Sequence, residues 1–431
     1  MLKSIREILK GGLENEEVEI NGWIHNKRSS GSIIFFIIRD GSGFLQVTAR
    51  KSNLTNFEEL EKITLESSVK IKGIVKKDER APGNYEIEAK KIEIYHKAEE
   101  NFPFMRKHKF TVSFIMKNRH LWLRSKKMFY ILTIRSSALK FFREWFLNNG
   151  YKEFQSPIIT KSACEGGATL FPVNYFGEEA YLTQSWQLYA EAAIASLGKI
   201  FTIAPSFRAE KSKTRRHLAE YWHIEAEEPW ITLEDLMKIE ENLISYVCQR
   251  ICEENSFELQ QLGRDVEEIK KVKPPFERIK YSDVIEILKK KGVNIKFGDD
   301  LGADEERIFT QDLKLPVFVY LYPIEIKAFY VKEDENNPGL GLSVDLLAPE
   351  GYGEITGGSI REENVEKMKE RLKKENLDTK NFEWYFDLRR FGSVPHGGFG
   401  LGLERFLMWI CKLKHIREAI GFPRLLRKVY P

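Results

Sequence analysis

A basic loop between two expected strands could bind an anionic ligand. The segment FRAEKSKTRRHLAEYWHIEAEE (Phe207 to Glu228) reads as a strand, a cationic loop at Lys211 to Arg216 and a returning strand that carries glutamates. Arg208 leaves the first strand, and the planar fork of an arginine binds two oxygens of a phosphate or carboxylate at once. The alternative for this segment alone is a solvated basic hairpin that pairs with its own glutamates.

A glycine-rich segment near the C-terminus is the second candidate. PHGGFGLGLERFLMWI (Pro395 to Ile410) reads as a strand that runs into an amphipathic helix starting near Glu404. Its glycines would let a planar ligand or another backbone approach closely. Arg405 falls in the first helical turn, where a cation is unfavourable unless an anion is nearby. That anion is either a ligand or a structural partner such as Glu354.

Two carboxylates on neighbouring expected strands form the third candidate. In SVDLLAPEGYGEITGGSIRE, Asp345 and Glu354 offer the oxygen ligands that Mg²⁺ takes while it keeps waters and phosphates. The alternative is a structural ion pair between Glu354 and Arg361. No GxxxxGK[ST] loop occurs in the sequence, so a bound nucleotide would need another device.

The length of the chain predicts two domains that must position these residues, because its 431 residues exceed the ~250 to 300 at which a single core stops growing. Val18 to His96 reads as five short strands, which predicts a small OB-type barrel, a fold that binds oligonucleotides on the face of its second and third strands. Alternation predicts that one of Phe35 and Phe36 points outward and the other inward. The alternative is that both phenylalanines belong to the core.

The rest of the chain predicts an α+β domain. Residues 99–124 are polar and basic and indicate a linker or hinge. Helices are expected over Met128 to Asn148, Leu233 to Cys252, Asp283 to Lys290 and Glu363 to Lys374. Strand-like runs alternate with these helices irregularly, which favours an antiparallel sheet over a doubly wound one.

Composition excludes several classes of protein. Lys and Arg total 68 and Asp and Glu total 64, so the net charge of +4 does not by itself indicate a nucleic-acid partner. The four cysteines form no CxxC pair and indicate reduced thiols rather than a zinc site. No apolar run approaches a membrane span and the N-terminus lacks a cleavable signal, so we expect a cytoplasmic protein without membrane association.

Taken together, the three segments resemble the motifs of the class II aminoacyl-tRNA synthetases, and within that class the aspartyl/asparaginyl group, over essentially the whole chain. GYKEFQSPIIT (Gly150 to Thr160) is similar to the end of motif 1, which would cover residues about 127–160. Residues 207–228 are similar to motif 2, and GLGLER within residues 395–410 is similar to motif 3.

The resemblance implies an OB-fold anticodon-binding domain at residues 1–98, a hinge at 99–124 and a class II catalytic domain at 125–431. It implies a catalytic sheet of six or seven antiparallel strands flanked by helices. It also implies a homodimer through the motif 1 region, with Pro157 at the interface.

The resemblance further implies that an amino acid is activated by ATP with Mg²⁺ and is then passed to a tRNA. Arg208 would hold the α-phosphate and the amino-acid carboxylate, and Arg405 would pack on adenine and hold the bent triphosphate. Glu354, with Asp345, would hold the metal, so Arg208, Arg405 and Glu354 are the expected catalytic residues. The implied ATP-binding set is Arg208, Glu210, Arg216, His217, Leu218, Tyr221, Glu354, Gly402 and Arg405.

One stretch implies that the amino acid is asparagine. Aspartyl members of the group carry a lysine at the end of a QSPQLYK-like stretch, whereas this chain reads QSWQLYA and places Ala190 there. Without that cation a substrate carboxylate would be buried unpaired. Glu225 would accept from the side-chain amide and Arg361 would donate to it. The implied amino-acid-binding set is Glu165, Gln187, Arg208, Glu225 and Arg361, and the implied tRNA is tRNA(Asn).

Three competing functions are an aspartyl enzyme, a tRNA-independent asparagine-forming ligase and a non-catalytic nucleic-acid-binding paralogue. Ala190 disfavours the first, the barrel disfavours the second, and the retained Arg208 and Arg405 disfavour the third.

Two further points concern single positions. Phe35 and Gln46 match the positions of the group that stack on the anticodon and read its uracil, and Arg28 would contact a phosphate or base of the anticodon. Aspartyl relatives often carry a serine three residues after the metal-binding glutamate, whereas this chain has Gly357, whose side chain cannot be a ligand. Whether Ser359 compensates stays open.

Overall fold

The computed structural model describes residues 1–104, 110–161, 164, 169–211, 214–375 and 377–431. These residues divide into two compact units, Met1–Phe114 and Ile115–Pro431. Each unit has a hydrophobic core built from its own residues.

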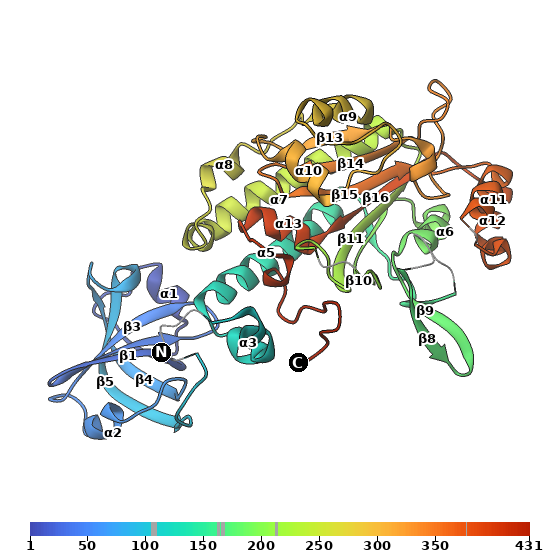
Figure 1. Cartoon of the computed structure of the whole chain (residues 1–431). Helices are drawn as coiled ribbons and strands as arrows, with labels where there is room; N and C mark the ends of the chain where they lie inside the picture. The colour runs from blue at the N-terminus through green and yellow to red at the C-terminus, as the bar shows by residue number, and fades with distance from the viewer. Residues whose placement is uncertain (105–109, 162–163, 165–168, 212–213, 376) are drawn as a thin grey trace. The chain divides into compact units, whose positions relative to one another are not determined.

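The first unit is a closed five-stranded barrel. Its elements are α1 (Ile5–Leu9), β1 (Glu17–Ser30), β2 (Ile33–Arg39), β3 (Phe44–Arg50), α2 (Phe57–Glu61), β4 (Ser68–Lys77), the 3-10 turn η1 (Pro82–Asn84) and β5 (Tyr85–His96). The strands close in the order β1-β2-β3-β5-β4, which confirms the five expected strands (Figure 1). Asp40 stabilises the β2–β3 turn, because its Oδ1 accepts from the N–H groups of Ser42 and Gly43 at 2.7 and 2.9 Å. Phe36 is buried and Phe35 is half-buried, so alternation divides the two phenylalanines as predicted.

The second unit is built on an eight-stranded sheet. Its helices are α4 (Arg119–Trp122), α5 (Lys126–Asn148), α6 (Gln187–Leu197), α7 (Leu233–Gln261), α8 (Val266–Lys270), α9 (Tyr281–Lys290), α10 (Ala303–Thr310), α11 (Val365–Lys374), α12 (Glu383–Arg390) and α13 (Leu403–Ile410), with 3-10 turns η3 (Ile324–Ile326), η4 (Thr379–Phe382) and η5 (Ile416–Glu418). Its strands are β6 (Lys152–Glu153), β7 (Ile159–Thr160), β8 (Phe171–Tyr175), β9 (Glu178–Leu182), β10 (Ile200–Phe207), β11 (Glu220–Pro229), β12 (Glu277–Lys280), β13 (Val317–Tyr320), β14 (Ser343–Ala348), β15 (Gly353–Ile360) and β16 (His396–Gly402). α5, α9 and α11 lie close to their expected bounds, whereas α7 continues well past Cys252.

The sheet has the order β12-β13-β14-β15-β16-β11-β10-β6. The six central strands, from β13 to β10, pair antiparallel as expected. The difference lies at the edges, where β12 pairs parallel with β13 and β6 pairs parallel with β10. Parallel neighbours need a crossover connection. α9 and α10 supply it at one edge, and the segment that contains α6 supplies it at the other.

The two faces of this sheet differ in character, because side chains alternate along each strand. One face packs against α5, α7 and α13 and supplies Ile224, Phe399, Leu401 and Leu346 to the main core (Figure 1). The opposite face is polar and is described next. The sequence pattern of β11, with apolar residues only at even positions from 222 to 226, produces this division.

One row of directly opposed residues crosses four strands on the polar face. It runs from Asp345 of β14 through Gly357 of β15 and Gly400 of β16 to Glu225 of β11. The two glycines place no side chain of their own on the floor between the two carboxylates. The ring of His223 lies over Gly400, since a Cβ on this glycine would be 2.4 Å from Nε2 of His223, so a larger residue there would displace the ring.

A β-bulge turns a further carboxylate toward this floor. The register between β14 and β15 shifts between Leu346 and Leu347, so that Leu347 lies opposite Glu354. Bulges re-aim side chains in this way. Because Leu347 and Asp345 point to the same face of β14, Glu354 joins Asp345 and Gly357 on the polar face.

Smaller elements surround the sheet. α6, α11 and α12 share a hydrophobic cluster, and β8 and β9 form a hairpin that projects from the second unit (Figure 1). Part of the expected linker at 99–124 folds as α3 (Val112–Lys117) and α4. Arg119 of α4 is buried and donates to the carbonyls of Arg417, Ile420 and Gly421 at 3.0, 2.7 and 2.7 Å, so α4 is fixed to the second unit.

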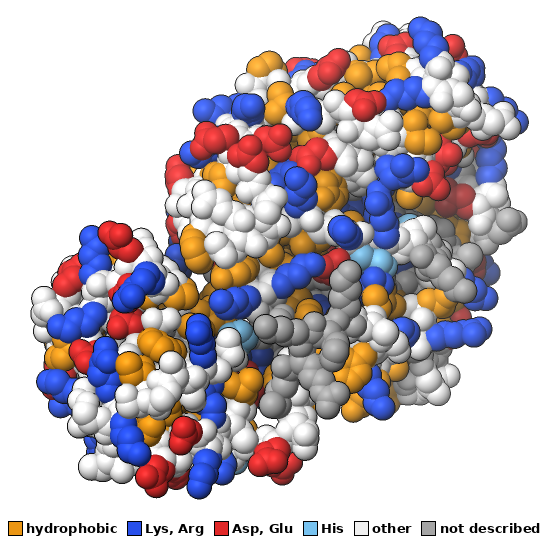
Figure 2. All heavy atoms as spheres, turned by 60° about the vertical axis from the view of Figure 1, so that its left-hand side comes forward, with side chains coloured by type: hydrophobic (Ala, Val, Ile, Leu, Met, Phe, Trp, Pro, Cys, Tyr) orange, Lys and Arg blue, Asp and Glu red, His pale blue; other side chains and the backbone are white. Residues whose placement is uncertain are grey.

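Basic and acidic side chains are interspersed over the face shown in Figure 2, in line with the net charge of +4. Among the described residues, no helix combines the length and hydrophobicity of a membrane span.

Candidate active site

The predicted nucleotide-binding residues converge on one cavity above the polar face. All of them except Glu210 line it, together with His223, Ile355, Gly400, Glu404 and Ile416. Glu210 lies beside the cavity, with its carboxylate 3.4 Å from Nε2 of His217 and 3.9 Å from Nη1 of Arg208. The guanidinium of Arg208 in turn lies over the ring of Tyr221, at 5.9 Å from its centroid.

Arg405 and Glu354 form an ion pair across this cavity. Nη1 of Arg405, in the first turn of α13, donates to Oε2 of Glu354 at 2.8 Å. Although burial raises it, the pKa of Glu354 is lowered to about 2 by Arg405, Arg216 and Lys327. The anion expected near Arg405 is therefore present in the protein itself. The alternative pairing of Glu354 with Arg361 does not occur, because Arg361 binds Glu227 instead.

The arrangement of Asp345 and Glu354 fits a hard cation. An ideal Cβ on Gly357 would lie 3.3 Å from Oδ1 of Asp345 and 3.6 Å from Oε1 of Glu354, so these two oxygens approach the same point above the glycine. The other oxygens are engaged, since Lys327 donates to Oδ2 of Asp345 at 2.9 Å and Arg405 donates to Oε2 of Glu354. Carboxylate oxygens that approach one point are the ligands that Mg²⁺ takes.

A larger cavity of about 590 Å³ adjoins the first. The two share Arg208, His223, Glu354 and Gly400 in their linings. The larger cavity is lined by Gln187, Arg208, Glu225, Arg361 and Asp345, which brings together the predicted amino-acid-binding residues that the structure describes. Glu165 lies outside the described residues.

Glu225 and Gln187 are both held in place from α6 or its N-terminus. Oε2 of Glu225 accepts from the N–H of Trp186 at 3.0 Å, and its Oε1 accepts from the hydroxyl of Ser185. Nε2 of Gln187 donates to Oε1 of Glu191 at 3.0 Å. Ala190, farther along α6, is fully buried in an apolar cluster with Trp186, so this position supplies no cation to the cavity.

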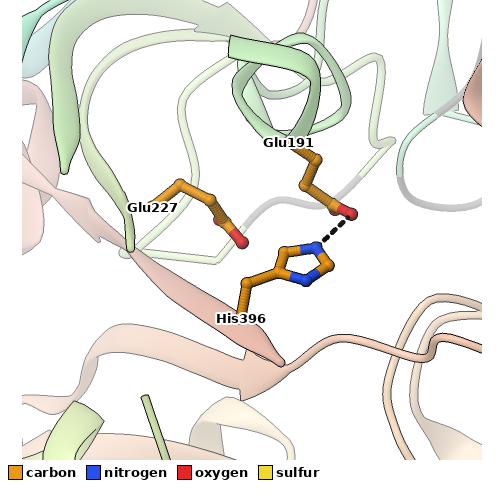
Figure 3. A group of neighbouring side chains, drawn as sticks. All are labelled: Glu191, Glu227 and His396. Carbon is orange, nitrogen blue, oxygen red and sulfur yellow. Dashed lines mark hydrogen bonds and ion pairs between the residues drawn. The ribbon is translucent and has the colours of Figure 1, made fainter. Parts of the chain in front are cut away.

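A buried charge cluster lies behind Arg361. Figure 3 shows the side chains of Glu191, Glu227 and His396 converging, a grouping that could in principle bind a metal ion. However, Arg361 donates to both oxygens of Glu227 at 2.9 and 2.8 Å, and His396 and Arg389 lie against Oε2 of Glu191 at 3.0 and 2.5 Å. The charges of two arginines thus balance those of two carboxylates, and the cluster orients Arg361 rather than binding a metal ion.

This cluster also settles the position of Ser359. Its hydroxyl accepts from Nη1 of Arg361 at 2.8 Å and is fully buried. The hydroxyl of Ser359 is therefore engaged with the arginine.

Several residues of the site were not expected from the sequence. They are Glu191, His223, Glu227, Lys327, Glu306 and His396. His223 and Glu227 could have been predicted from the sequence. With Tyr221 and Glu225 they occupy every second position of one strand, so all four side chains point to the same face. Glu306 and Lys327 carry no such signal, because distant segments bring them to the site.

The predicted anticodon residues share one outer face of the barrel. Phe35 of β2 lies directly opposite Arg28 of β1 and Thr48 of β3. Gln46 points to the same face as Thr48, two residues along β3. Nε2 of Gln46 and the hydroxyl of Thr48 both donate to Oε2 of Glu86, at 2.8 and 2.6 Å, which fixes the glutamine. Arg28 is exposed, so an aromatic ring, a cation and an amide lie together on this surface.

Comparison with known proteins agrees with both units. The family model described as tRNA synthetases class II (D, K and N) matches residues 111–426, and the model described as OB-fold nucleic acid binding domain matches residues 18–95. The asparagine-tRNA ligase of Thermoplasma acidophilum is 48% identical over 99% of this chain and 100% of its own length.

Solved structures agree as well. Asparaginyl-tRNA synthetase from Pyrococcus horikoshii, complexed with asparaginyl-adenylate, superimposes with a TM-score of 0.93 at 47% identity, covering 97% of each chain. The asparaginyl-tRNA synthetase of Entamoeba histolytica with the same adenylate gives a TM-score of 0.91 at 34% identity, covering 100% of this chain and 99% of the other. The chain therefore belongs to the class II tRNA synthetases of the D, K and N group.

Proposed function

We propose that this protein is an asparagine-tRNA ligase, which activates L-asparagine with ATP and transfers it to the 3′ end of tRNA(Asn). The observation that carries the proposal is a pair of adjoining cavities on one face of the sheet, in a chain that matches asparagine-tRNA ligases over its full length. One cavity takes the nucleotide and the other takes the amino acid. Arg208 lines both, as a group that must contact both substrates would.

The first step joins the two substrates. A carboxylate oxygen of asparagine attacks the α-phosphorus of ATP, and pyrophosphate leaves with the bonding electrons. No protein nucleophile takes part, so catalysis consists of positioning and of charge stabilisation on the pentacovalent phosphorus. Arg208 holds the carboxylate and α-phosphate, while Arg405 holds the triphosphate.

The second step transfers the amino acid. A hydroxyl of the terminal ribose of tRNA attacks the acyl carbon of the adenylate, and AMP leaves. In the nucleotide cavity, Tyr221 stacks on adenine, and Arg216 and His217 contact the phosphates. Glu210 also contacts the nucleotide, and the remaining members of the set, Leu218 and Gly402, contribute backbone or packing contacts.

Charge at the end of the amino-acid cavity supports asparagine. Glu225 accepts a hydrogen bond from the side-chain amide and Arg361 donates one to its oxygen. The charge of Arg361 is already matched by Glu227 at 2.8 Å, so a substrate carboxylate would meet Glu225 without a free cation to offset it. Gln187, together with Glu165, binds the α-ammonium group.

Mg²⁺ is the proposed metal, held by Glu354 and Asp345. When bound, it would neutralise phosphate charge. Glu354 is ionised at neutral pH, since its pKa is lowered to about 2 despite burial, chiefly by Arg405.

The barrel is the proposed anticodon reader. Phe35 stacks on a base, Gln46 hydrogen-bonds to one, and Arg28 contacts a phosphate or base. Aromatic platforms beside cations are typical of OB folds that bind single-stranded nucleic acid.

A homodimer through the motif 1 region is also proposed. Pro157, Ile158 and Ile159 are all exposed, which leaves an apolar strip in this region. A cytoplasmic setting is supported by the four cysteines, which are all buried as thiols.

The test is ATP-pyrophosphate exchange on the full chain with Mg²⁺, with asparagine and aspartate assayed side by side and without tRNA. We expect exchange with asparagine and little with aspartate, followed by charging of tRNA(Asn). An Arg208→Gln chain purified in the same way reports exchange from contaminating host enzymes. Exchange with aspartate alone would identify an aspartyl enzyme. No exchange with either amino acid would contradict the proposal that the protein activates an amino acid.

A further inference from the structure

We propose that Glu306 of α10 is a positioning residue for ATP binding, which acts by fixing Arg216 and the backbone of Glu354. The inference rests on the proposed function and names a residue outside the ATP-binding and amino-acid-binding sets expected from the sequence. It also gives a role to α10, a helix that is not among those expected from the sequence.

The side chain of Glu306 makes two contacts that lie in the nucleotide site. Its Oε2 accepts from Nη1 of Arg216 at 2.6 Å and from the backbone N–H of Glu354, also at 2.6 Å. Nη2 of Arg216 in turn donates to the backbone carbonyl of Glu354 at 2.8 Å. The three residues therefore form a closed ring of hydrogen bonds in which one carboxylate oxygen orients both an arginine and a catalytic glutamate.

Burial makes this ring stiff. Arg216 and Glu306 have only 5% and 9% of their side chains exposed. A buried charge-assisted hydrogen bond is stronger than one in water, and leaving either charge unpaired is costly. Arg216 lines the nucleotide cavity while Glu306 and Glu354 line the larger one, so the ring lies at the border of the two.

The backbone at Gly353 is adapted to this ring. Gly353 has φ +71°, and a Cβ there would lie 2.4 Å from Oε2 of Glu306 and 2.7 Å from Nη1 of Arg216. Any larger residue would thus displace the ion pair. The residue before Glu354 is therefore constrained to leave room for Glu306.

The two carboxylates therefore have different roles. Glu354 contacts the ligand, whereas Glu306 positions Arg216 and the backbone of Glu354. Without Glu306, Arg216 would lose the partner that sets its direction, and the β15 backbone at Glu354 would lose a hydrogen bond that fixes its carboxylate above Gly357. Both losses weaken the binding of ATP and leave the asparagine contacts at Glu225 and Gln187 intact.

The test compares Glu306→Gln with Asp304→Asn. Both change a carboxylate to an amide on α10, but the side chain of Asp304 is 83% exposed. In pyrophosphate exchange, we expect Glu306→Gln to raise KM for ATP about 10- to 100-fold, as loss of a hydrogen bond to a charged group would. KM for asparagine at saturating ATP should change little, and Asp304→Asn should resemble the wild type in both constants.

Binding provides a readout independent of turnover. Calorimetric titration with a non-hydrolysable ATP analogue should show the same loss of affinity in Glu306→Gln. Adding Glu306→Gln to Arg216→Gln should weaken binding little further, because both substitutions break one ring. Full additivity of the two would show that Glu306 does not act through Arg216 and would overturn the proposal.

Two outcomes separate this inference from the proposed function. If the wild type exchanges with asparagine and Glu306→Gln has an unchanged KM for ATP, the inference fails and the function stands. If the wild type does not exchange at all, the function itself fails. Should Glu306→Gln not fold, as judged by circular dichroism, Glu306→Asp takes its place and is expected to raise KM for ATP in the same direction by a smaller factor. An unchanged KM for ATP in Glu306→Asp would then overturn the inference.

Discussion

Glu354 of β15 and Arg405 in the first turn of α13 are bonded directly to each other, because Nη1 of Arg405 donates to Oε2 of Glu354 at 2.8 Å. Each is proposed to contact ATP, yet in the protein alone each is the partner of the other. The glutamate keeps the arginine oriented at the N-terminus of α13, where the helix dipole disfavours a cation. Nucleotide binding then adds phosphate to an arginine that is already in place.

Replacing Arg405 should therefore abolish activation while leaving the fold intact. For Arg405→Gln we expect pyrophosphate exchange to fall about 100- to 1,000-fold, the usual loss for a group that stabilises transition-state charge. The control is Arg390→Gln, since Arg390 lies on the surface of α12 and forms ion pairs with Glu383 and Asp387, away from both cavities. Equal exchange in the two variants would argue against a role for Arg405.

The buried carboxyl of Glu240 should make stability depend on pH. It lies in α7 beneath the sheet, where its Oε2 accepts from the hydroxyl of Thr356, and burial raises its pKa from 4.5 to about 8. The folded protein therefore keeps this proton up to about pH 8, whereas the unfolded chain releases it near pH 4.5. Its contribution to stability is full below pH 4.5 and is lost as the pH rises toward about 8.

Glu240→Gln keeps this site uncharged at every pH. Relative to the wild type, the variant should thus gain melting temperature as the pH rises from about 5 to about 8, by at least about 2 °C. Thermal unfolding followed by circular dichroism measures the difference. Glu253→Gln, on the exposed side of the same helix, should show no such trend. A constant difference for Glu240→Gln would mean that Glu240 is already ionised at neutral pH.

Phe35→Ala should separate tRNA recognition from amino-acid activation. Loss of one base-aromatic stack predicts a rise of about 5- to 100-fold in KM for tRNA(Asn). Pyrophosphate exchange should not change, because the barrel has its own core and the exchange reaction uses only the second unit. Tyr95→Ala removes an exposed aromatic of β5 and serves as the control. A similar rise for Tyr95→Ala would point to general damage to the barrel.

The proposed dimer can be tested at Ile158. Ile158 and Ile159 are 43% and 41% exposed, and an aspartate at Ile158 would place a charge in the proposed interface. Ile158→Asp should shift the protein from dimer to monomer in light scattering. Leu315→Asp alters an equally exposed leucine elsewhere in the second unit and should leave the dimer intact. A dimeric Ile158→Asp variant would place the interface elsewhere.

Local patterns in the sequence predicted much of the fold. Five strands with turn residues between them gave the barrel, and alternation gave the different positions of Phe35 and Phe36. The six antiparallel strands of the central sheet were also recognisable as runs of alternating or apolar residues. The edge strands β6 and β12 were missed, because two and four residues are too few to show a period.

The site was predicted in part. Arg208, Glu354 and Arg405 stand in segments whose composition indicates chemistry, and the ion pair of the last two was one of the alternatives considered. The pairing of the supporting residues could not be predicted. Arg216 and Glu306 are 90 residues apart and Arg361 and Glu227 are 134 apart, so only tertiary packing brings each pair together. The sequence of α10 is mostly polar, which is typical of a surface helix, yet Glu306 is buried in the structure.

The row from Asp345 through Gly357 and Gly400 to Glu225 fixes the distance between the two ends of the site. Neighbouring strands lie about 4.8 Å apart. Three strand spacings therefore hold Asp345, proposed to bind the metal, about 14 Å from Glu225, proposed to bind the side-chain amide of the substrate. Movement of loops does not change this distance, because all four residues of the row belong to hydrogen-bonded strands. A relative that selects a different amino acid can exchange the residues at these four positions, but it must keep the distance between them.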